Sequence, residues 1–107
     1  MAEKRTEHFD EKTNRLADVA KALSHPARVK ILQILAEKNA CICGEIVDLL
    51  PFSQSTVSQH LKELKRVGLV KGEIEGPKRC YCLDVDAALE AKTVFENLFD
   101  AIRKNTA

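Results

Sequence analysis

Four cysteines carry the most distinctive chemistry of this 107-residue chain. They fall in two Cys-x-Cys pairs, Cys41 with Cys43 and Cys80 with Cys82. Thiolates are soft ligands, and two of them at this spacing can share one soft metal ion. The first ten residues are polar and mixed in charge, which predicts a cytoplasmic chain without an export signal, whose thiols stay reduced. We therefore expect metal binding, redox sensing or plain packing in preference to structural disulfides.

Catalytic chemistry of other kinds has no support in the sequence. Histidines occur only at His8, His25 and His60, and there is no Gly-rich phosphate loop, His-Glu metal motif or plausible nucleophile–base pair. A small thiol oxidoreductase or metal carrier can use Cys-x-Cys, but the chain lacks the βαβ pattern that would support it. We expect a protein that is not an enzyme and needs no obligatory cofactor.

The formal net charge of +1 hides a local pattern. Residues 53–80 carry six Lys or Arg against three acidic residues, whereas the rest of the chain carries 11 basic and 13 acidic residues. The basic middle of the chain can therefore face a polyanion. No apolar run approaches the roughly 18 residues of a membrane-spanning helix, so we expect no membrane partner.

The apolar spacing predicts five helices and one β-hairpin. Pro26 suits the first turn of the second helix, while Ser53 and Asp86 are expected to cap the fourth and the last helix. Gly76-Pro77 predicts the turn of the hairpin. This order is typical of a mainly α winged helix-turn-helix with a small β-hairpin, here one domain over 1–107. The expected helices are 9–23, one from Pro26, 44–50, one from Ser53 to near Gly68, and 86–104; the strands are 69–75 and 80–85, so that 44–67 forms the helix-turn-helix and 69–85 the wing.

The fourth helix has the composition of a helix that reads DNA. Val57, Leu61 and Leu64 form a stripe at helical spacing, and the opposite face carries short hydroxyl and amide side chains that suit the major groove. A solvated polar face on an ordinary helix is the alternative. His60 contacts phosphate or acts as a partly buried spacer, and we favour the spacer. Arg66 lies where a backbone contact would fit. The expected DNA-binding residues are Ser53, Gln54, Ser55, Thr56, Ser58, Gln59, Lys62, Lys65, Lys78 and Arg79.

The last helix has a wider apolar stripe than one small core needs. Two copies of a small reading domain would also double the contacts to a palindrome. We expect a homodimer built on helices 9–23 and 86–104, although packing of the last helix on its own domain is the alternative. The apolar residues are Ala87, Ala88, Leu89, Ala91, Val94, Phe95, Leu98, Phe99, Ala101 and Ile102.

Three segments resemble one known family. Residues 23–32 (LSHPARVKIL), 41–46 (CICGEI) and 53–61 (SQSTVSQHL) are similar to the ArsR/SmtB family of bacterial metal-responsive repressors, and 68–83 resembles its wing. The resemblance implies a homodimeric winged-helix repressor that leaves double-stranded operator DNA when an inducer binds.

The segment from Cys41 resembles the Cys-Val-Cys-Asp-Leu inducer motif of arsenic, cadmium and lead sensors in that family, but has Gly44-Glu45 where the motif has Asp. The resemblance implies arsenite, antimonite or another soft metal ion as inducer. Cys41 and Cys43 lie just before or at the start of the third helix, so a bound ion would move the reading helix. Arsenite would need a third thiolate from Cys80, Cys82, the partner chain or a small thiol. Oxidation or persulfidation of the cysteines is the alternative signal.

The second cysteine pair is expected on the outer face of the wing strand. Alternation along a strand places Tyr81, Leu83 and Val85 on the core face, and Cys80 and Cys82 on the other. These two cysteines are possible metal ligands, and packing is the alternative. The family's zinc site on the last helix is not expected, because that helix contains no histidine.

Overall fold

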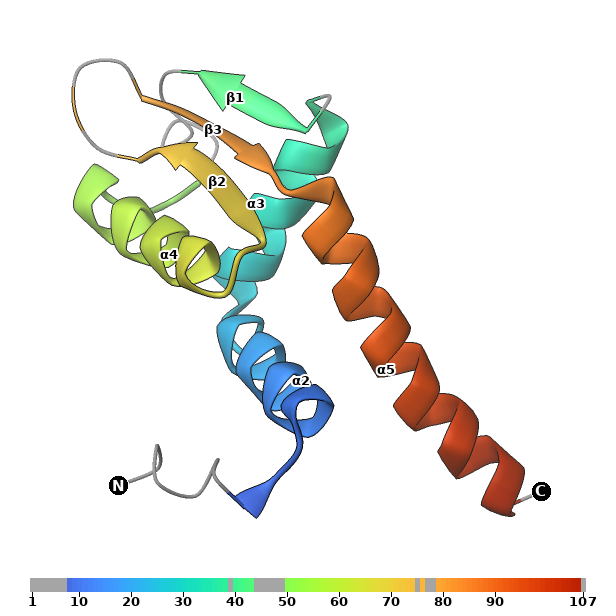
Figure 1. Ribbon diagram of the computed structural model, residues 1–107. Helices are drawn as coiled ribbons and strands as arrows, with labels where there is room; N and C mark the ends of the chain where they lie inside the picture. Colours follow the sequence, from blue (N-terminus) through green and yellow to red (C-terminus); the bar gives the residue numbers. More distant parts are fainter. Residues whose placement is uncertain (1–7, 39, 44–49, 75, 77–78, 107) are drawn as a thin grey trace.

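The computed structural model describes residues 8–38, 40–43, 50–74, 76 and 79–106. They form a mainly helical fold with one small sheet, as the sequence predicts (Figure 1). The helix expected over 44–50 lies outside the described residues except for Leu50, and Lys78 also lies outside them. The elements in chain order are α2 (Glu11–Ala22), α3 (Pro26–Glu37), β1 (Cys41–Cys43), α4 (Gln54–Arg66), β2 (Val70–Glu73), β3 (Cys80–Leu83) and α5 (Val85–Thr106).

Side-chain caps start the first three of these helices. Asp10 accepts a hydrogen bond from the Thr13 amide at 2.7 Å. The Nδ1 atom of His25 accepts from the Ala27 amide at 3.0 Å, with Pro26 at the first helical position. Ser53 caps α4 as predicted, since its Oγ accepts from the Thr56 amide at 3.3 Å. Each cap satisfies an amide that the helix itself leaves without an acceptor.

The start of α5 differs from the prediction. Asp84, and not Asp86, caps this helix, because its Oδ1 accepts from the Ala87 amide at 3.1 Å and its carbonyl accepts from the Ala88 amide at 2.9 Å. Asp86 instead lies in the first turn, where a carboxylate interacts favourably with the helix dipole. Val85 therefore belongs to the helix rather than to the core face of a strand, and 49% of it is exposed.

The sheet has three antiparallel strands in the order β1-β3-β2, one more than the predicted hairpin. The extra strand is β1, which pairs with β3 so that Ile42 faces Tyr81. On the other side of β3, Gly72 of β2 also pairs with Tyr81. Gly72 has φ +109°, and a Cβ there would overlap the carbonyl oxygen of Cys80. Only glycine fits this position without displacing the wing strand.

The core lies between α3, α4 and the inner face of the sheet. Tyr81 is buried from β3 as predicted, and Leu83 packs against the same cluster. The predicted stripe of α4 is also confirmed, since all three of its residues are buried. The fully buried side chains of largest volume are Ile31, Leu35, Leu61, Leu64, Val19 and Val70.

The long helix α5 extends away from the sheet and runs beside α2 (Figure 1). Arg15 of α2 contacts both the end of α4 and α5. Its Nη1 donates to the carbonyl of Val67, the C-cap of α4, at 2.6 Å, and its Nε lies 3.6 Å from a carboxylate oxygen of Glu90 on α5. Much of the apolar surface of α5 stays uncovered within one chain. Its exposed large apolar residues are Val85, Leu89, Leu98, Phe99 and Ile102. None of the helices in the described ranges is both long enough and apolar enough to cross a membrane.

Candidate nucleic-acid interface and cysteine cluster

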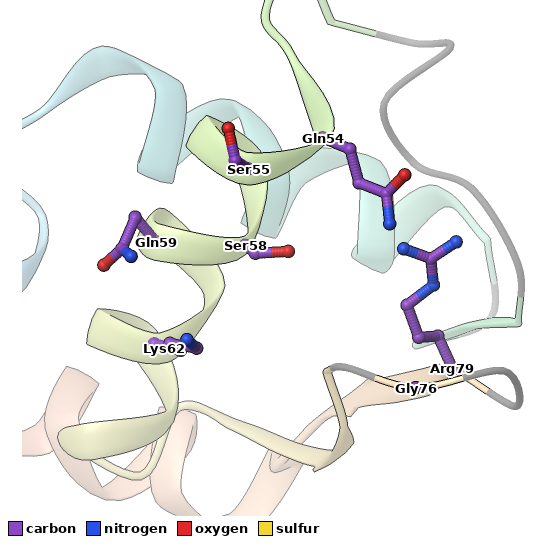
Figure 2. A pocket seen from close by; sticks show the side chains of 7 residues that line it. All are labelled: Gln54, Ser55, Ser58, Gln59, Lys62, Gly76 and Arg79. Atoms are coloured by element: carbon purple, nitrogen blue, oxygen red, sulfur yellow. The ribbon is translucent and has the colours of Figure 1, made fainter.

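The exposed face of α4 and the wing together line an open polar hollow of about 510 Å³. Burial of Val57, Leu61 and Leu64 against the core turns the opposite side of α4 outward. Figure 2 shows the hydroxyl and amide side chains of α4 on one side of the hollow and the wing on the other. The lining residues are Gln54, Ser55, Ser58, Gln59 and Lys62 from α4, with Gly76 and Arg79 from the wing.

Arg79 connects the wing to the start of α4. Its guanidinium points toward the side-chain amide of Gln54 (Figure 2). With the Gln54 amide turned so that its oxygen faces Arg79, that oxygen accepts hydrogen bonds from the guanidinium. The structure therefore brings together two predicted DNA-binding residues that are 25 positions apart in the sequence.

The first turn of α4 is ordered by its own hydroxyl groups. Ser53 Oγ donates to Thr56 Oγ1 at 3.1 Å and lies 3.2 Å from Ser55 Oγ. These contacts accompany the backbone cap made by Ser53. Two of the predicted DNA-binding residues, Ser53 and Thr56, therefore serve first to shape the helix terminus.

The basic residues at the far end of α4 also make contacts within the protein. Lys65 Nζ donates to the Gly72 carbonyl at 2.8 Å, which fastens α4 to β2. Arg66 pairs with Asp18 at 3.0 Å and with Glu63 at 2.7 Å. The hydrogen bond from Arg66 lowers the pKa of Glu63, and the two carboxylates raise the pKa of Arg66. Because both carboxylates neutralise its charge, Arg66 is a weaker candidate for a DNA contact than its place in the sequence indicates.

His60 is a buried spacer, as we favour from the sequence, rather than an exposed phosphate contact. Only 9% of it is exposed, and its Nδ1 accepts a hydrogen bond from Arg28 Nε at 3.2 Å. The His25 ring lies 4.4 Å from the His60 ring, centroid to centroid. Burial, with smaller effects of His25 and Arg28, lowers the pKa of His60. The hydrogen bond from Arg28 to His60 joins α3 to α4, a link that sequence reasoning missed.

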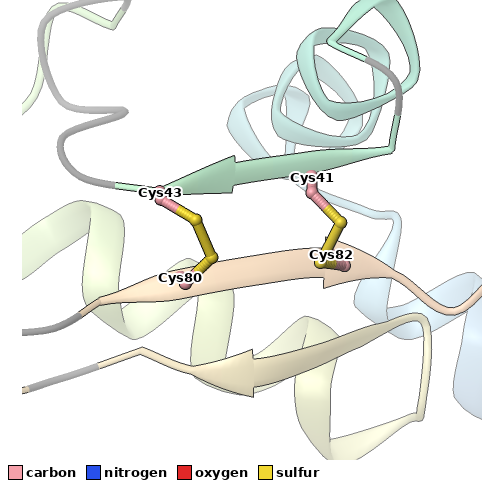
Figure 3. The surroundings of a disulfide bond; sticks show 4 residues. All are labelled: Cys41, Cys43, Cys80 and Cys82. Atoms are coloured by element: carbon pink, nitrogen blue, oxygen red, sulfur yellow. A yellow bond between two sulfur atoms is a disulfide. The ribbon is translucent and has the colours of Figure 1, made fainter.

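All four cysteines meet on one face of the sheet (Figure 3). The register pairs Cys41 with Cys82 and Cys43 with Cys80, each with 4.0 Å between the Cα atoms. Disulfide bonds join both cross-strand pairs. The expectation of reduced thiols, which rested on the absence of an export signal, is therefore wrong for this structure, and the strand β1 that brings the two pairs together was not foreseen. With these thiols bonded, no group of three His, Cys, Asp or Glu residues in the described ranges is arranged to hold a metal ion.

Comparisons with known proteins identify the family. The family model described as "Bacterial regulatory protein, arsR family" matches residues 25–71. An uncharacterized HTH-type transcriptional regulator of Methanocaldococcus jannaschii is 37% identical over 89 residues, which cover 82% of this chain and 99% of that protein. The chain belongs to the ArsR family. As in other transcriptional regulators of this kind, the helix-turn-helix is the segment expected to contact DNA.

Two relatives named as repressors resemble this ArsR-family chain over shorter stretches. The HTH-type transcriptional repressor SmtB of Mycobacterium tuberculosis is 42% identical over 66 residues, covering 62% of this chain and 48% of SmtB. The arsenical resistance operon repressor of Staphylococcus xylosus is 36% identical over 69 residues, covering 64% of this chain and 65% of the repressor. The chain thus spans less than two thirds of the length of both proteins.

The fold is also similar to that of a solved structure. The crystal structure of M. tuberculosis Rv0081 superposes with a TM-score of 0.57 at 26% identity, covering 92% of this chain and 100% of that one. This similarity extends to the long helices outside the family match. Cys41 and Cys43 lie inside the segment matched by the ArsR family, whereas Cys80 and Cys82 lie outside it.

Proposed function

We propose that this ArsR-family protein is a transcriptional repressor that binds its operator sequence-specifically through α4 and the wing. The observation that carries the proposal is the hollow in which the polar face of α4 meets Arg79 of the wing. Amide side chains can make two hydrogen bonds to adenine, hydroxyls can bond to bases or phosphates, and cations contact phosphates. Base contacts are assigned to Gln54, Ser55, Ser58 and Gln59, and contacts to the DNA backbone to Ser53, Thr56, Lys62, Lys65, Lys78 and Arg79.

We further propose that the repressor is a homodimer built on α2 and α5. Five large apolar residues of α5 are exposed within one chain, and Phe9 just before α2 is 58% exposed. A second copy would bury this apolar surface and place a second α4 on the other half of a palindromic operator. Contacts to two half-sites also supply an affinity that one small reading domain lacks.

The proposed inducer is a soft metal ion, with arsenite or antimonite as the preferred candidates. Two relatives are named as SmtB and as an arsenical resistance repressor, and Cys41 and Cys43 lie in the family-matched segment before α4. When reduced, these thiols would supply two soft ligands. The facing residues Cys80 and Cys82 offer the third thiolate that trivalent arsenic prefers, from within the same chain. An inducer that binds the DNA-free form more tightly weakens DNA binding, typically by about 1–3 kcal/mol of coupling.

The test uses a DNA duplex that the reduced protein selects from a random library, with binding followed by fluorescence anisotropy. Arsenite is expected to release the wild-type protein from this duplex. The double variant Cys41→Ser/Cys43→Ser is expected to bind the duplex equally well and to stay bound when arsenite is added. Wild-type protein that stays bound in arsenite, or a double variant that is released equally, would contradict the proposed inducer.

The cross-strand disulfides favour a second candidate signal, which is oxidation or persulfidation of the cysteines. In this alternative, a hydroperoxide or a polysulfide weakens DNA binding without any metal ion. Treatment of the wild-type complex with each reagent alone distinguishes the two candidates. Release by peroxide or polysulfide, with no response to arsenite, would favour thiol chemistry as the signal.

A further inference from the structure

The strand register brings each cysteine closer to its partner on the other strand than to its neighbour in the sequence motif. The Cα atoms of Cys43 and Cys80 are 4.0 Å apart, as are those of Cys41 and Cys82. The two cysteines of one motif lie two positions apart on the same strand, where the Cα atoms are separated by about 6.6 Å. A sulfur oxidised at either motif therefore meets a sulfur of the other motif first.

The cluster lies on the outer face of the sheet, where small molecules in solution can reach it. The residues between the cysteines, Ile42 and Tyr81, pack on the opposite, inner face. Cys41 and Cys43 are exposed on the edge strand β1, while their partners on the central strand β3 are half-buried. An external oxidant therefore reaches the sulfurs of Cys41 and Cys43, the two proposed inducer ligands, first. Each of them has a less exposed sulfur of β3 next to it.

We propose that the four cysteines form one oxidation site that gates the inducer site. In this arrangement Cys82 and Cys80 are the resolving thiols for Cys41 and Cys43, and the oxidant is a hydroperoxide. The inference rests on the proposed function, in which Cys41 and Cys43 hold a soft metal ion. It adds that the repressor responds to this ion only when both cross-strand disulfides are reduced.

The chemistry balances with one hydroperoxide for each disulfide. The thiolate of Cys43 attacks the outer oxygen of the hydroperoxide, the O–O bond breaks, and an alcohol or water leaves as the sulfur becomes a sulfenic acid. The thiol of Cys80 then attacks that sulfur, the S–O bond breaks, and water leaves as the disulfide forms. The same two steps join Cys41 to Cys82. Each pair loses two electrons to the peroxide, and a dithiol reductant returns them.

Oxidation removes both proposed metal ligands at once. A soft ion binds the thiolate form of cysteine, and a sulfur in a disulfide has no thiolate to offer. Each cross-strand disulfide contains one of the two proposed ligands, so neither Cys41 nor Cys43 can bind the ion in the oxidised protein. A disulfide within each motif would also remove the ligands, but the register of β1 and β3 favours the cross-strand alternative.

Phenylarsine oxide is the probe for the gate, because its arsenic takes only two thiolates and releases its oxygen as water. Intact mass spectrometry counts the arsenical bound to the full chain. We expect the reduced wild type, whose four thiols offer up to two pairs, to bind at least one arsenical, and to bind none after treatment with diamide, which converts dithiols to disulfides. The variant Cys80→Ser/Cys82→Ser lacks the resolving thiols and is expected to keep its arsenical under the same diamide treatment. The proposed control of the inducer site by oxidation would be overturned if diamide abolished arsenical binding in this variant as it does in the wild type. Full binding of the arsenical by the oxidised wild type would also overturn it.

Peptide mapping of the wild type tests the pairing without any variant. Trypsin leaves Cys41 and Cys43 on the peptide 39–62 and places Cys80 and Cys82 on the peptide 80–92. After hydroperoxide treatment, the proposal predicts one species in which these two peptides are joined. Two separate peptides, each closed by its own disulfide, would overturn it.

The two proposals fail in different ways. If the arsenical binds only reduced protein but does not release DNA, the proposed inducer function falls and the gate stands. If the arsenical releases DNA from oxidised and reduced wild type alike, the gate falls and the inducer function stands.

Discussion

The guanidinium of Arg79 on the wing lies against the side-chain amide of Gln54, the first residue of α4 (Figure 2). If Gln54 reads a base, Arg79 fixes the orientation of its amide. We predict that Gln54→Ala costs about 1–3 kcal/mol of discrimination at one base position. We also predict that Gln54→Ala and Arg79→Ala are not additive in DNA binding, with a coupling of about 0.5–3 kcal/mol. Anisotropy titrations of the two single variants and the double variant measure this coupling, and additive losses would show that the contact has no role on DNA.

The burial of His60 beside His25 and Arg28 predicts a specific pH dependence of stability. The pKa of His60 is lowered from its ordinary value of 6.5, so the folded protein binds fewer protons here than the unfolded chain. The free energy of unfolding contributed by this group is present above the unfolded pKa and decreases as the pH falls below it. Urea unfolding at about pH 7.5 and about pH 5.5 checks this. The variant His60→Gln, which cannot titrate, should lose less stability between these pH values than the wild type, whereas equal losses would assign the pH dependence to other groups.

Two glycines of the wing provide a matched test of the sheet. Both Gly72 and Gly76 have positive φ, but only at Gly72 would a Cβ overlap backbone, at the Cys80 carbonyl. Gly76→Ala should cost about 1–2 kcal/mol, which is the backbone preference alone. Gly72→Ala should cost more, because β2 and β3 must also separate. Urea unfolding of both variants measures the difference, and equal costs would contradict the close approach of the two strands.

The exposed face of α5 predicts the effect of one added charge. Phe99 is 61% exposed in a single chain, and the proposed dimer would bury it. Phe99→Asp should produce folded monomers and weaken binding to a palindromic duplex by at least about tenfold. Asn97→Asp adds the same charge at an exposed polar position and should remain dimeric. Light scattering after size-exclusion chromatography gives the mass of each variant. If Phe99→Asp is still a dimer, this face of α5 is not part of the dimer interface.

Features that depend on local spacing were predictable from the sequence. The stripe of Val57, Leu61 and Leu64 follows the helical period, so the inner and outer faces of α4 are fixed by local sequence. The cap at Ser53 is equally local. The sequence predicts the cap of α5 two residues too late, at Asp86 instead of Asp84, because both side chains are suited to capping. Only the backbone course after β3 distinguishes them.

Features that depend on pairing between distant segments were not predictable in the same way. The strand Cys41–Cys43 is too short to show alternation, and its partner lies about 40 positions away in the sequence. The sequence therefore presents the four cysteines as two separate pairs rather than as one cluster. It presents Arg66 as a DNA contact for the same reason, since its partner Asp18 is 48 positions away.

The salt dependence of DNA binding tests most directly whether α4 and the wing contact DNA. Lys62 lines the hollow, whereas Arg66 on the same helix is neutralised by two carboxylates. The slope of log affinity against log salt falls in magnitude by about 0.9 for each phosphate that the protein no longer neutralises. We predict this decrease, once per subunit, for Lys62→Ala, and an unchanged slope for Arg66→Ala on the same duplex. An unchanged slope for Lys62→Ala, or an equal decrease for Arg66→Ala, would contradict the proposed face.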